Sequence, residues 1–134
     1  MCFLDAYSGY HQIKMAESDQ VATAFIIPYD PFCFNTMPFG LKNADATYQR
    51  MIQTCLEKQI GKTVEAYMDD VVIKTRHLET LIDDLRLTFD NIRTYDIKLN
   101  PEKCVLGVPS GKLLSFIVSN RGIEANPAKI RALS

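Results

Sequence analysis

Apolar and polar positions follow two periods along this chain, one typical of buried strands and one typical of amphipathic helices. Residues 2–5 and 64–73 are short apolar runs, and two adjacent carboxylates interrupt the second, which is rich in β-branched side chains. In residues 44–60 and 77–94 the apolar side chains recur every three or four positions, which predicts two amphipathic helices. We expect both helices to cover one face of a sheet formed by the strands.

The predicted helices have recognisable ends and faces. Asn43 is a good N-cap for the first helix, and Gly61 is a typical stop. The apolar face of the second helix is predicted to comprise Leu78, Leu81, Ile82, Leu85, Phe89 and Ile92. The adjacent acids Asp83 and Asp84 then lie on its solvated face.

Turn-forming residues mark the remaining elements. The apolar runs 21–27 and 32–37 are separated by a segment with two prolines, which predicts a hairpin. Short strands are predicted at 97–100 and 103–108. A hairpin strand with a turn at each end is predicted at 111–122, and Pro127 is expected to open a helical turn. Strands and helices do not alternate as in a doubly wound sheet, so the pattern favours an α+β fold.

Asp69 and Asp70, the two carboxylates of the 64–73 run, have apolar neighbours on both sides. Aspartate is a good turn residue, so a plain turn between two strands explains the pair. A two-residue hairpin loop, however, prefers Asn-Gly or Asp-Gly, because its central residues need positive φ. Asp-Asp is a poor choice there, which favours a chemical purpose for the second carboxylate.

Asp5 adds a third carboxylate, at the end of another apolar strand. If the two strands are neighbours, the three carboxylates converge and repel one another unless cations neutralise them. Hard oxygen ligands without His or Cys favour Mg²⁺ or Mn²⁺. Two such ions in one site stabilise the attacking and leaving oxygens of an in-line phosphoryl displacement. The pattern predicts a metal-dependent phosphoryl-transfer site, with the plain turn as the open alternative.

Composition narrows the partners and the compartment. The chain has 134 residues, 47% of them hydrophobic, which is enough for one domain with a core. Its net charge of −1 excludes a global basic field, so nucleic acid must be held by a local patch or by further segments. The four cysteines lack C-x-x-C spacing, so we expect buried, reduced thiols in an intracellular protein. No apolar run reaches membrane-spanning length.

The chain contains five stretches that together carry a family resemblance: LDAYSGYHQIKM, TAF, MPFGLKNADATYQRM, YMDDVVIKT and LNPEKCVLGVPSGKLLSFIVSNRGIEANPAKI. In order and spacing they resemble the reverse transcriptases of retroviruses and retrotransposons, most closely the gypsy class of LTR retrotransposons. The aromatic-x-Asp-Asp box alone is weakly specific, but its combination with the D-x-x-x-G-Y and P-F-G-L-K-N boxes is highly specific. The resemblance implies a reverse transcriptase palm, an antiparallel sheet backed by two helices, with a partial fingers hairpin.

The resemblance also implies an activity and roles in it. The activity is RNA-directed DNA polymerisation, in which dNTPs are added to a primer 3′-OH. Asp5, Asp69 and Asp70 resemble the catalytic, metal-binding aspartates, with the Ala6 carbonyl as a further ligand of two Mg²⁺ ions, or of Mn²⁺. Tyr10 matches the aromatic under the incoming sugar, whose ring would clash with a 2′-OH and so favours dNTP over rNTP.

Other matching positions are expected to contact the nucleotide or the primer and template. The nucleotide-side residues are Ala6, Tyr10, Phe39, Gly40 and Lys103, the last near the pyrophosphate (or Cys104, if the alignment is off by one). The primer and template residues are Leu41, Lys42, Asn43, Tyr67, Met68, Leu114, Ser115 and Phe116, and residues 113–118 resemble the hairpin that grips the primer. Without the resemblance, Lys103 is an ordinary surface lysine and Phe39-Gly40 an ordinary turn.

Three positions depart from the family pattern. Asp45 stands where gypsy-class members more often carry a small residue, commonly glycine, and Asp30 and Ser115 stand where glycine is usual. A decaying genomic copy would look like this, so the alternative function is a catalytically inactive retrotransposon remnant that at most binds nucleic acid. A haloacid-dehalogenase-like phosphatase ranks last, because that family needs a second Asp where this chain has Tyr7.

The resemblance divides the chain into four parts: the first catalytic strand of the palm (1–13), the fingers hairpin (14–38), the palm with the catalytic hairpin and two helices (39–107), and the primer-grip hairpin with the start of the thumb connection (108–134). Because Met1 leads straight into a core strand, we expect a fragment. Its expected partners are an RNA or DNA template with primer, dNTPs and the remaining Pol segments (fingers, thumb, ribonuclease H), without a membrane. The expected location is the cytoplasm, within virus-like particles of the element, or else the nucleus.

Overall fold

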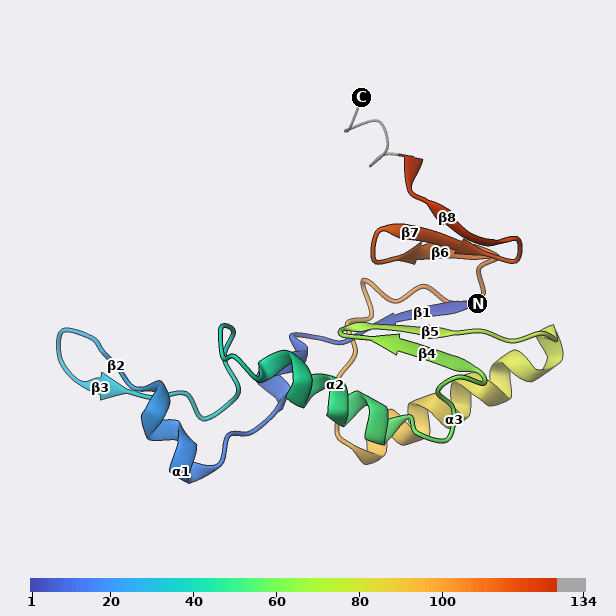
Figure 1. Ribbon diagram of the computed structural model, residues 1–134. Coiled ribbons are helices and arrows are strands. Elements are labelled where there is room, and N and C mark those ends of the chain that lie inside the picture. The colour runs from blue at the N-terminus through green and yellow to red at the C-terminus, as the bar shows by residue number, and fades with distance from the viewer. Residues whose placement is uncertain (128–134) are drawn as a thin grey trace.

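A three-stranded antiparallel sheet lies at the centre of the computed structural model, which describes residues 1–127 (Figure 1). Its strands are β1 (Cys2–Asp5), β4 (Val64–Tyr67) and β5 (Asp70–Ile73), in the order β1-β5-β4. The apolar runs form strands because their side chains fill the core: Cys2 and Ile73, opposite each other in the register, are fully buried. The predicted sheet is confirmed.

Two helices, α2 (Ala44–Cys55) and α3 (Leu81–Thr94), cover one face of this sheet (Figure 1). Their buried residues are Ala44, Tyr48, Ile52 and Cys55 in α2 and Leu81, Leu85, Thr88 and Ile92 in α3. The α+β class is thus confirmed, although both helices are shorter than predicted. A 3₁₀ turn, η3 (Leu78–Thr80), precedes α3 and replaces its expected first turn.

The predicted apolar face of α3 is wrong at two positions. Leu78 is 81% exposed and Ile82 60% exposed. Leu78 lies before the helix begins, and Ile82 lies about 100° around the axis from Leu81, outside the stripe that Leu81 and Leu85 share. The small polar residue Thr88 completes the stripe instead.

Gln59, in the turns after α2, joins that region to α3 from inside the core. Its side chain is 2% exposed, and its Nε2 donates to Thr88 Oγ1 at 3.0 Å. Asn91 Nδ2 donates in turn to Gln59 Oε1 at 2.9 Å. Buried amide groups are stable only when paired in this way.

The predicted hairpin at 21–37 forms but is much shorter. After α1 (Glu17–Gln20) and the 3₁₀ turn η2 (Val21–Thr23), the hairpin contains only β2 (Phe25–Ile26) and β3 (Pro31–Phe32). Its strands are exposed, so no burial of side chains stabilises longer strands. Pro31 also has no N–H group to donate to the neighbouring strand. The hairpin projects from the side of the sheet and helices (Figure 1).

A second three-stranded sheet lies on the side of the central sheet away from the helices (Figure 1). It consists of β6 (Ser110–Leu113), β7 (Phe116–Ser119) and β8 (Gly122–Ala125). The hairpin expected at 113–118 is present as β6 and β7, but the strand predicted over 111–122 is not continuous, because the chain turns at Leu114, which has φ +55. The predicted helical turn at Pro127 continues into 128–134, outside the described residues.

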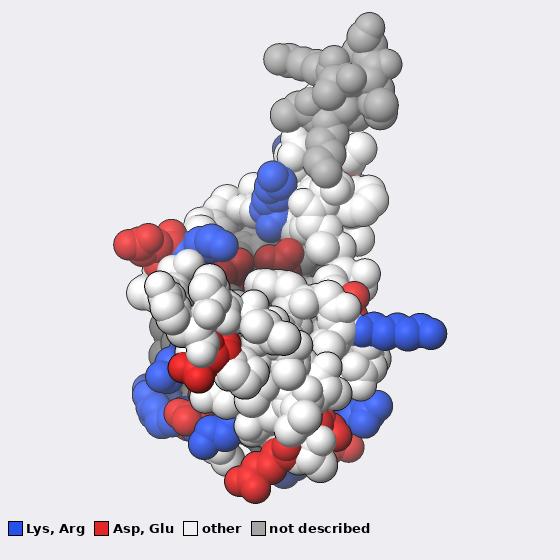
Figure 2. Space-filling view, turned by 90° about the vertical axis from the view of Figure 1, so that its left-hand side faces the viewer, with Lys and Arg blue, Asp and Glu red and all other residues white. Residues whose placement is uncertain are grey.

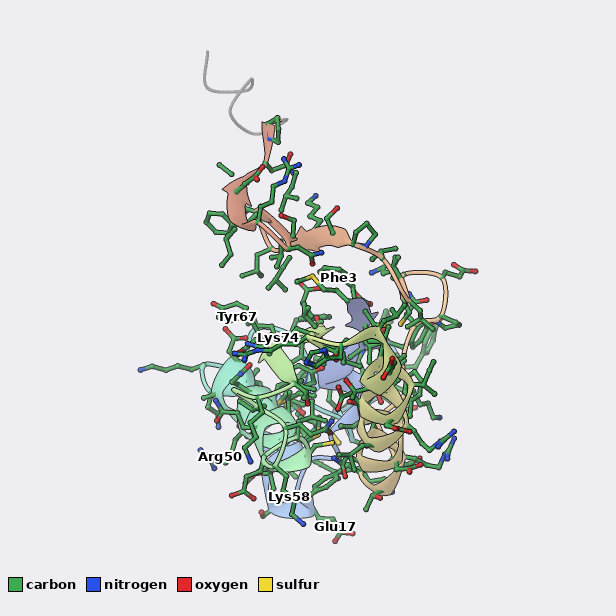
Figure 3. All side chains as sticks on the ribbon, turned by 90° about the vertical axis from the view of Figure 1, so that its right-hand side faces the viewer. Phe3, Glu17, Arg50, Lys58, Tyr67 and Lys74 are labelled. Atoms are coloured by element: carbon green, nitrogen blue, oxygen red, sulfur yellow. The ribbon has the colours of Figure 1, made fainter. Side chains whose placement is uncertain are left out.

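Close packing on Phe3 attaches this second sheet to the first (Figure 3). A Cβ atom added to Gly111 would come within 2.5 Å of the Phe3 Cζ atom, so only glycine lets β6 approach this closely. The strands predicted at 97–100 and 103–108 are wrong: the bridges Ala6↔Leu99 and Phe3↔Val105 are isolated. This segment runs antiparallel beside β1 and is held to it by separated backbone hydrogen bonds at Tyr7, Asp5 and Phe3, without forming a continuous strand.

The prediction that the four cysteines are buried holds for only two of them. Cys2 and Cys55 are buried, Cys104 is half-buried and Cys33 is exposed on the hairpin, and all four are free. Within residues 1–127 no helix has the length and apolar character needed to cross a membrane.

Candidate active site

The pairing of β1 with β5 brings the three aspartates to one edge of the central sheet. Asp5 lies directly opposite Asp70, and the Ala6 amide donates to the Asp69 carbonyl at 3.1 Å. Opposed residues on antiparallel strands have Cβ atoms about 4.5–5.5 Å apart, so the carboxyl groups of Asp5 and Asp70 are close neighbours. The expected convergence is present, while the roles of these residues stay predictions.

The loop between β4 and β5 consists of Met68 and Asp69, so the prediction of a turn centred on Asp69-Asp70 is wrong by one residue. Met68 is the residue with positive φ, +50. Asp69 has an ordinary negative φ, so its side chain causes no strain in the backbone at this position.

The side chain of Gln49 on α2 holds this loop in place. The Met68 amide donates to Gln49 Oε1 at 3.0 Å, and Gln49 Nε2 donates to the Ala66 carbonyl at 3.3 Å. Sequence reasoning missed Gln49. Its signal is position: Asp45, Tyr48 and Gln49 are spaced i, i+3, i+4 and share the face of α2 that meets the site.

Burial perturbs two of the three carboxyl groups. It raises the pKa of Asp69 above the ordinary 3.8, and the charges of Asp5 and Asp70 raise it further. The Tyr48 hydroxyl opposes this rise from nearby, but it does not reach hydrogen-bond geometry, and Asp69 Oδ1 is buried without a partner. Burial also raises the pKa of Asp70, with Asp5 adding to the effect.

Basic and backbone groups offset part of this negative charge. Lys103 Nζ lies 3.8 Å from Asp5 Oδ1, and its positive charge lowers the pKa of both Asp69 and Asp70. The Leu114 amide, at the turn between β6 and β7, also lowers the pKa of Asp70. Figure 2 shows acidic side chains recessed among basic ones below the C-terminal sheet. The sequence-predicted Lys103 and Leu114 therefore do lie at the carboxylates.

A cluster of aromatic rings in T-shaped and tilted contact includes Tyr10, Phe39 and Tyr48. The Tyr10 ring centroid is 5.1 Å from that of Phe39 and 5.3 Å from that of Tyr48. Gly9, in the 3₁₀ turn η1 (Gly9–Gln12), packs where a Cβ atom would come within 2.5 Å of Asp69 Oδ1 and 2.6 Å of the Tyr48 ring. Phe39 is 68% exposed and covers Tyr10, which is buried.

The other predicted contact residues form two groups: Tyr67 lies opposite Asp70 in the sheet register and Met68 precedes Asp69, whereas residues 40–43 belong to the loop after Phe39. Gly40 (φ +92) follows Phe39 in a loop, and Leu41 and Asn43 line a separate cavity of about 400 Å³. Exposed residues among them are Lys42, Asn43, Tyr67, Leu114 and Phe116, while Met68 and Ser115 are half-buried. The structure thus joins Asp5, Asp69, Asp70, Lys103 and the Leu114 amide, with Tyr67 and Met68 beside them, and leaves residues 40–43 in a separate loop.

The donor set suits a hard divalent cation. No group of three or more His, Cys, Asp or Glu side chains within residues 1–127 is arranged, as it stands, to hold a metal ion. The unpaired, buried Asp69 oxygen and two carboxyl groups that burial pushes towards protonation are nevertheless features that a bound cation would relieve. Oxygen ligands without His or Cys match Mg²⁺ or Mn²⁺.

Comparison with known proteins gives relatives of one kind. Residues 1–132 match the family model described as reverse transcriptase (RNA-dependent DNA polymerase). The chain is 40% identical over 131 residues to the retrovirus-related Pol polyprotein from transposon opus of Drosophila melanogaster, covering 98% of this chain and 13% of that protein. It is 36% identical over 137 residues to the corresponding polyprotein from transposon gypsy of the same organism, covering 97% and 13%.

Solved structures agree in fold. The foamy viral protease-reverse transcriptase in complex with RNA/DNA hybrid superposes with a TM-score of 0.88 at 18% identity, covering 99% of this chain and 18% of that one. The same protein in complex with double-stranded DNA gives a TM-score of 0.85. The chain spans about an eighth of the length of these Pol polyproteins. With a family model that matches almost every residue, this chain belongs to the reverse transcriptase family.

Proposed function

We propose that this chain is the palm core of an RNA-directed DNA polymerase that adds dNTPs to a primer 3′-OH during retrotransposon replication. The observation that carries the proposal is the meeting of Asp5 with Asp69 and Asp70 at one sheet edge, where a buried carboxylate oxygen has no partner. A structural turn has no need of an unpaired buried oxygen, because leaving one costs about 1–3 kcal/mol.

Asp5, Asp69 and Asp70, with the Ala6 carbonyl, would hold two divalent ions, Mg²⁺ or Mn²⁺. When bound, such ions stabilise the attacking and leaving oxygens of phosphoryl transfer. Lys103, already at Asp5, would release that carboxylate to the cations and place its charge near the leaving pyrophosphate.

The remaining residues would position the substrates. Tyr10, supported by Phe39, would close the sugar side of the site against a 2′-OH. The β6–β7 turn lies against Asp70 through the Leu114 amide, which would bring a primer end held by this hairpin, together with Met68, to the carboxylates. The template would contact the loop formed by Gly40, Leu41, Lys42 and Asn43.

Partners follow from the same proposal. The foamy viral relatives are described in complex with RNA/DNA hybrid and with double-stranded DNA, and we propose a primer–template and dNTPs for this chain. The fingers, thumb and ribonuclease H segments of a Pol protein would complete it, around the four parts at 1–13, 14–38, 39–107 and 108–134. The proposed location is the cytoplasm, in virus-like particles of the element.

Primer extension on an RNA template, with Mg²⁺ or Mn²⁺, tests the proposal. The chain and a longer Pol protein containing it are compared, each with the variants Asp69→Asn and, as a control on the solvated face of α3, Asp83→Asn. We expect extension that Asp69→Asn abolishes and Asp83→Asn leaves intact. Binding of primer–template without extension by the longer protein would instead support the inactive remnant.

A further inference from the structure

One hydrogen bond between side chains near the site has no role in the function proposed above. The Tyr10 hydroxyl donates to Asp45 Oδ1 with an oxygen–oxygen distance of 2.6 Å. The two residues are 35 positions apart, one in η1 and the other in the first turn of α2. At this length the contact is a strong, charge-assisted hydrogen bond.

The contact fixes the last free part of the Tyr10 side chain. Its ring, only 7% exposed, packs against Phe39 in a T-shaped arrangement and against Tyr48 in a tilted one. Packing restricts the ring, and a fixed partner for the hydroxyl further restrains movement of the phenol along its own plane. Asp45 is that partner, and it holds the hydroxyl at the N-terminal end of α2.

Asp45 is well placed to act as a fixed acceptor. It lies in the first helical turn, where the helix dipole stabilises a carboxylate. It makes no ion pair with any basic residue among positions 1–127, so its oxygens are available to Tyr10.

We propose that Asp45 is a positioning residue that locks the Tyr10 ring in place and thereby sharpens the choice of dNTP over rNTP. The inference rests on the proposed function, in which Tyr10 faces the sugar. A ring fixed at both its face and its hydroxyl cannot retreat from a 2′-OH, whereas a ring fixed only by packing can. On this view Asp45 adds sugar selectivity and is not a sign of decay.

The first test measures the hydrogen bond itself and needs no polymerase activity. The bond to Asp45 is the main cause that raises the pKa of Tyr10 to about 12, ahead of burial and of the charges of Asp45 and Asp69. In the chain labelled with ¹³Cζ-tyrosine, the Tyr10 signal is assigned by its loss in Tyr10→Phe. In Asp45→Asn the pKa should return towards 10.0, the ordinary value. In Asp83→Asn, the matched first-turn control on α3, it should not move.

The second test measures sugar choice in the longer Pol protein that supports primer extension. Losing one hydrogen bond should raise relative rNTP incorporation by Asp45→Gly by roughly threefold to tenfold. Tyr10→Ala should raise it further, and adding Asp45→Gly to Tyr10→Ala should change nothing more. Asp45→Glu should partly restore selectivity.

The outcomes separate this inference from the proposed function. An unchanged Tyr10 titration in Asp45→Asn overturns the inference whatever the activity. A shifted titration with an unchanged rNTP to dNTP ratio in an active protein overturns the selectivity role. Absence of extension by every form of the longer protein counts against the proposed function, while the titration still decides whether Asp45 holds Tyr10.

Discussion

Gly9 lacks a Cβ atom, and the Asp69 carboxyl group and the Tyr48 ring occupy the space that such an atom would need. Gly9→Ala is therefore the sharpest single test of the packing around Asp69. The added methyl group would lie 2.5 Å from Asp69 Oδ1 and 2.6 Å from the Tyr48 ring, where ordinary contacts begin at 3.4 Å. Those atoms must therefore retreat by about 0.9 Å, the difference between 3.4 and 2.5 Å. Overpacking of this kind costs roughly 1–3 kcal/mol.

A backbone effect acts in the opposite direction. The φ of Gly9 is not in the left-handed region, so alanine fits its backbone and stabilises by about 0.4–1 kcal/mol by restricting the unfolded chain. The net expectation is a loss of roughly 1–2 kcal/mol in the free energy of unfolding, measured by urea denaturation. The same variant should displace the Asp69 carboxyl group and weaken binding of Mn²⁺, measured by paramagnetic relaxation.

Gly61→Ala provides the matched control. Gly61 has φ +78 and no atom within 4 Å of an added Cβ, so alanine there costs about 1–2 kcal/mol through backbone strain alone. Both variants should lose similar stability, but only Gly9→Ala should alter Mn²⁺ binding. A Gly9→Ala protein as stable as the wild type, with unchanged Mn²⁺ affinity, would refute the packing described around Asp69.

Three further predictions concern charge and packing. Because burial raises the pKa of Asp69 and Asp70 in the folded state, the metal-free protein should lose stability as pH rises from 3.8 through the raised pKa values, which urea melts in EDTA would show. Gln59→Leu should cost roughly 1–3 kcal/mol in the same assay, because the half-buried Asn91 amide loses its acceptor and the buried Thr88 hydroxyl keeps only its bond to the Asp84 carbonyl. Gly111→Ala should push β6 off Phe3, and faster amide hydrogen exchange at the β6–β7 turn would report it.

Much of the fold follows from the sequence because its signals are periodic and local. The continuous apolar character of β1 and β5 predicts burial on both faces, which the structure shows, and the 3.6-residue spacing gives each helix one buried face. The errors occur where the burial pattern depends on tertiary packing. Ile82 is apolar like a core residue, but it lies on the side of α3 that faces away from the core. Leu78 lies before that helix begins.

The candidate site was only partly predictable for a similar reason. A carboxylate at a strand end is visible in a sequence, so Asp5, Asp69 and Asp70 could be predicted to converge. Side chains that act through long-range contacts give no such pattern. Gln49 reaches the hairpin loop 19 positions away, and Asp45 reaches Tyr10 35 positions away. Their shared face on α2 becomes meaningful only once the helix is placed against the loop.

The central claim is that the three aspartates form a site whose charge needs bound cations, and thermal melts of the wild type and Asp69→Asn in EDTA and in Mg²⁺ test it most directly. Removing one negative charge from the buried, mutually repelling carboxyl groups should leave Asp69→Asn at least as stable as the wild type in EDTA. Saturating Mg²⁺, at about a hundred times its dissociation constant, should stabilise the wild type by roughly 2.7 kcal/mol and the variant far less. An Asp69→Asn protein clearly less stable than the wild type in EDTA, or stabilised by Mg²⁺ to the same degree, would show that the pair is a structural turn and contradict the account.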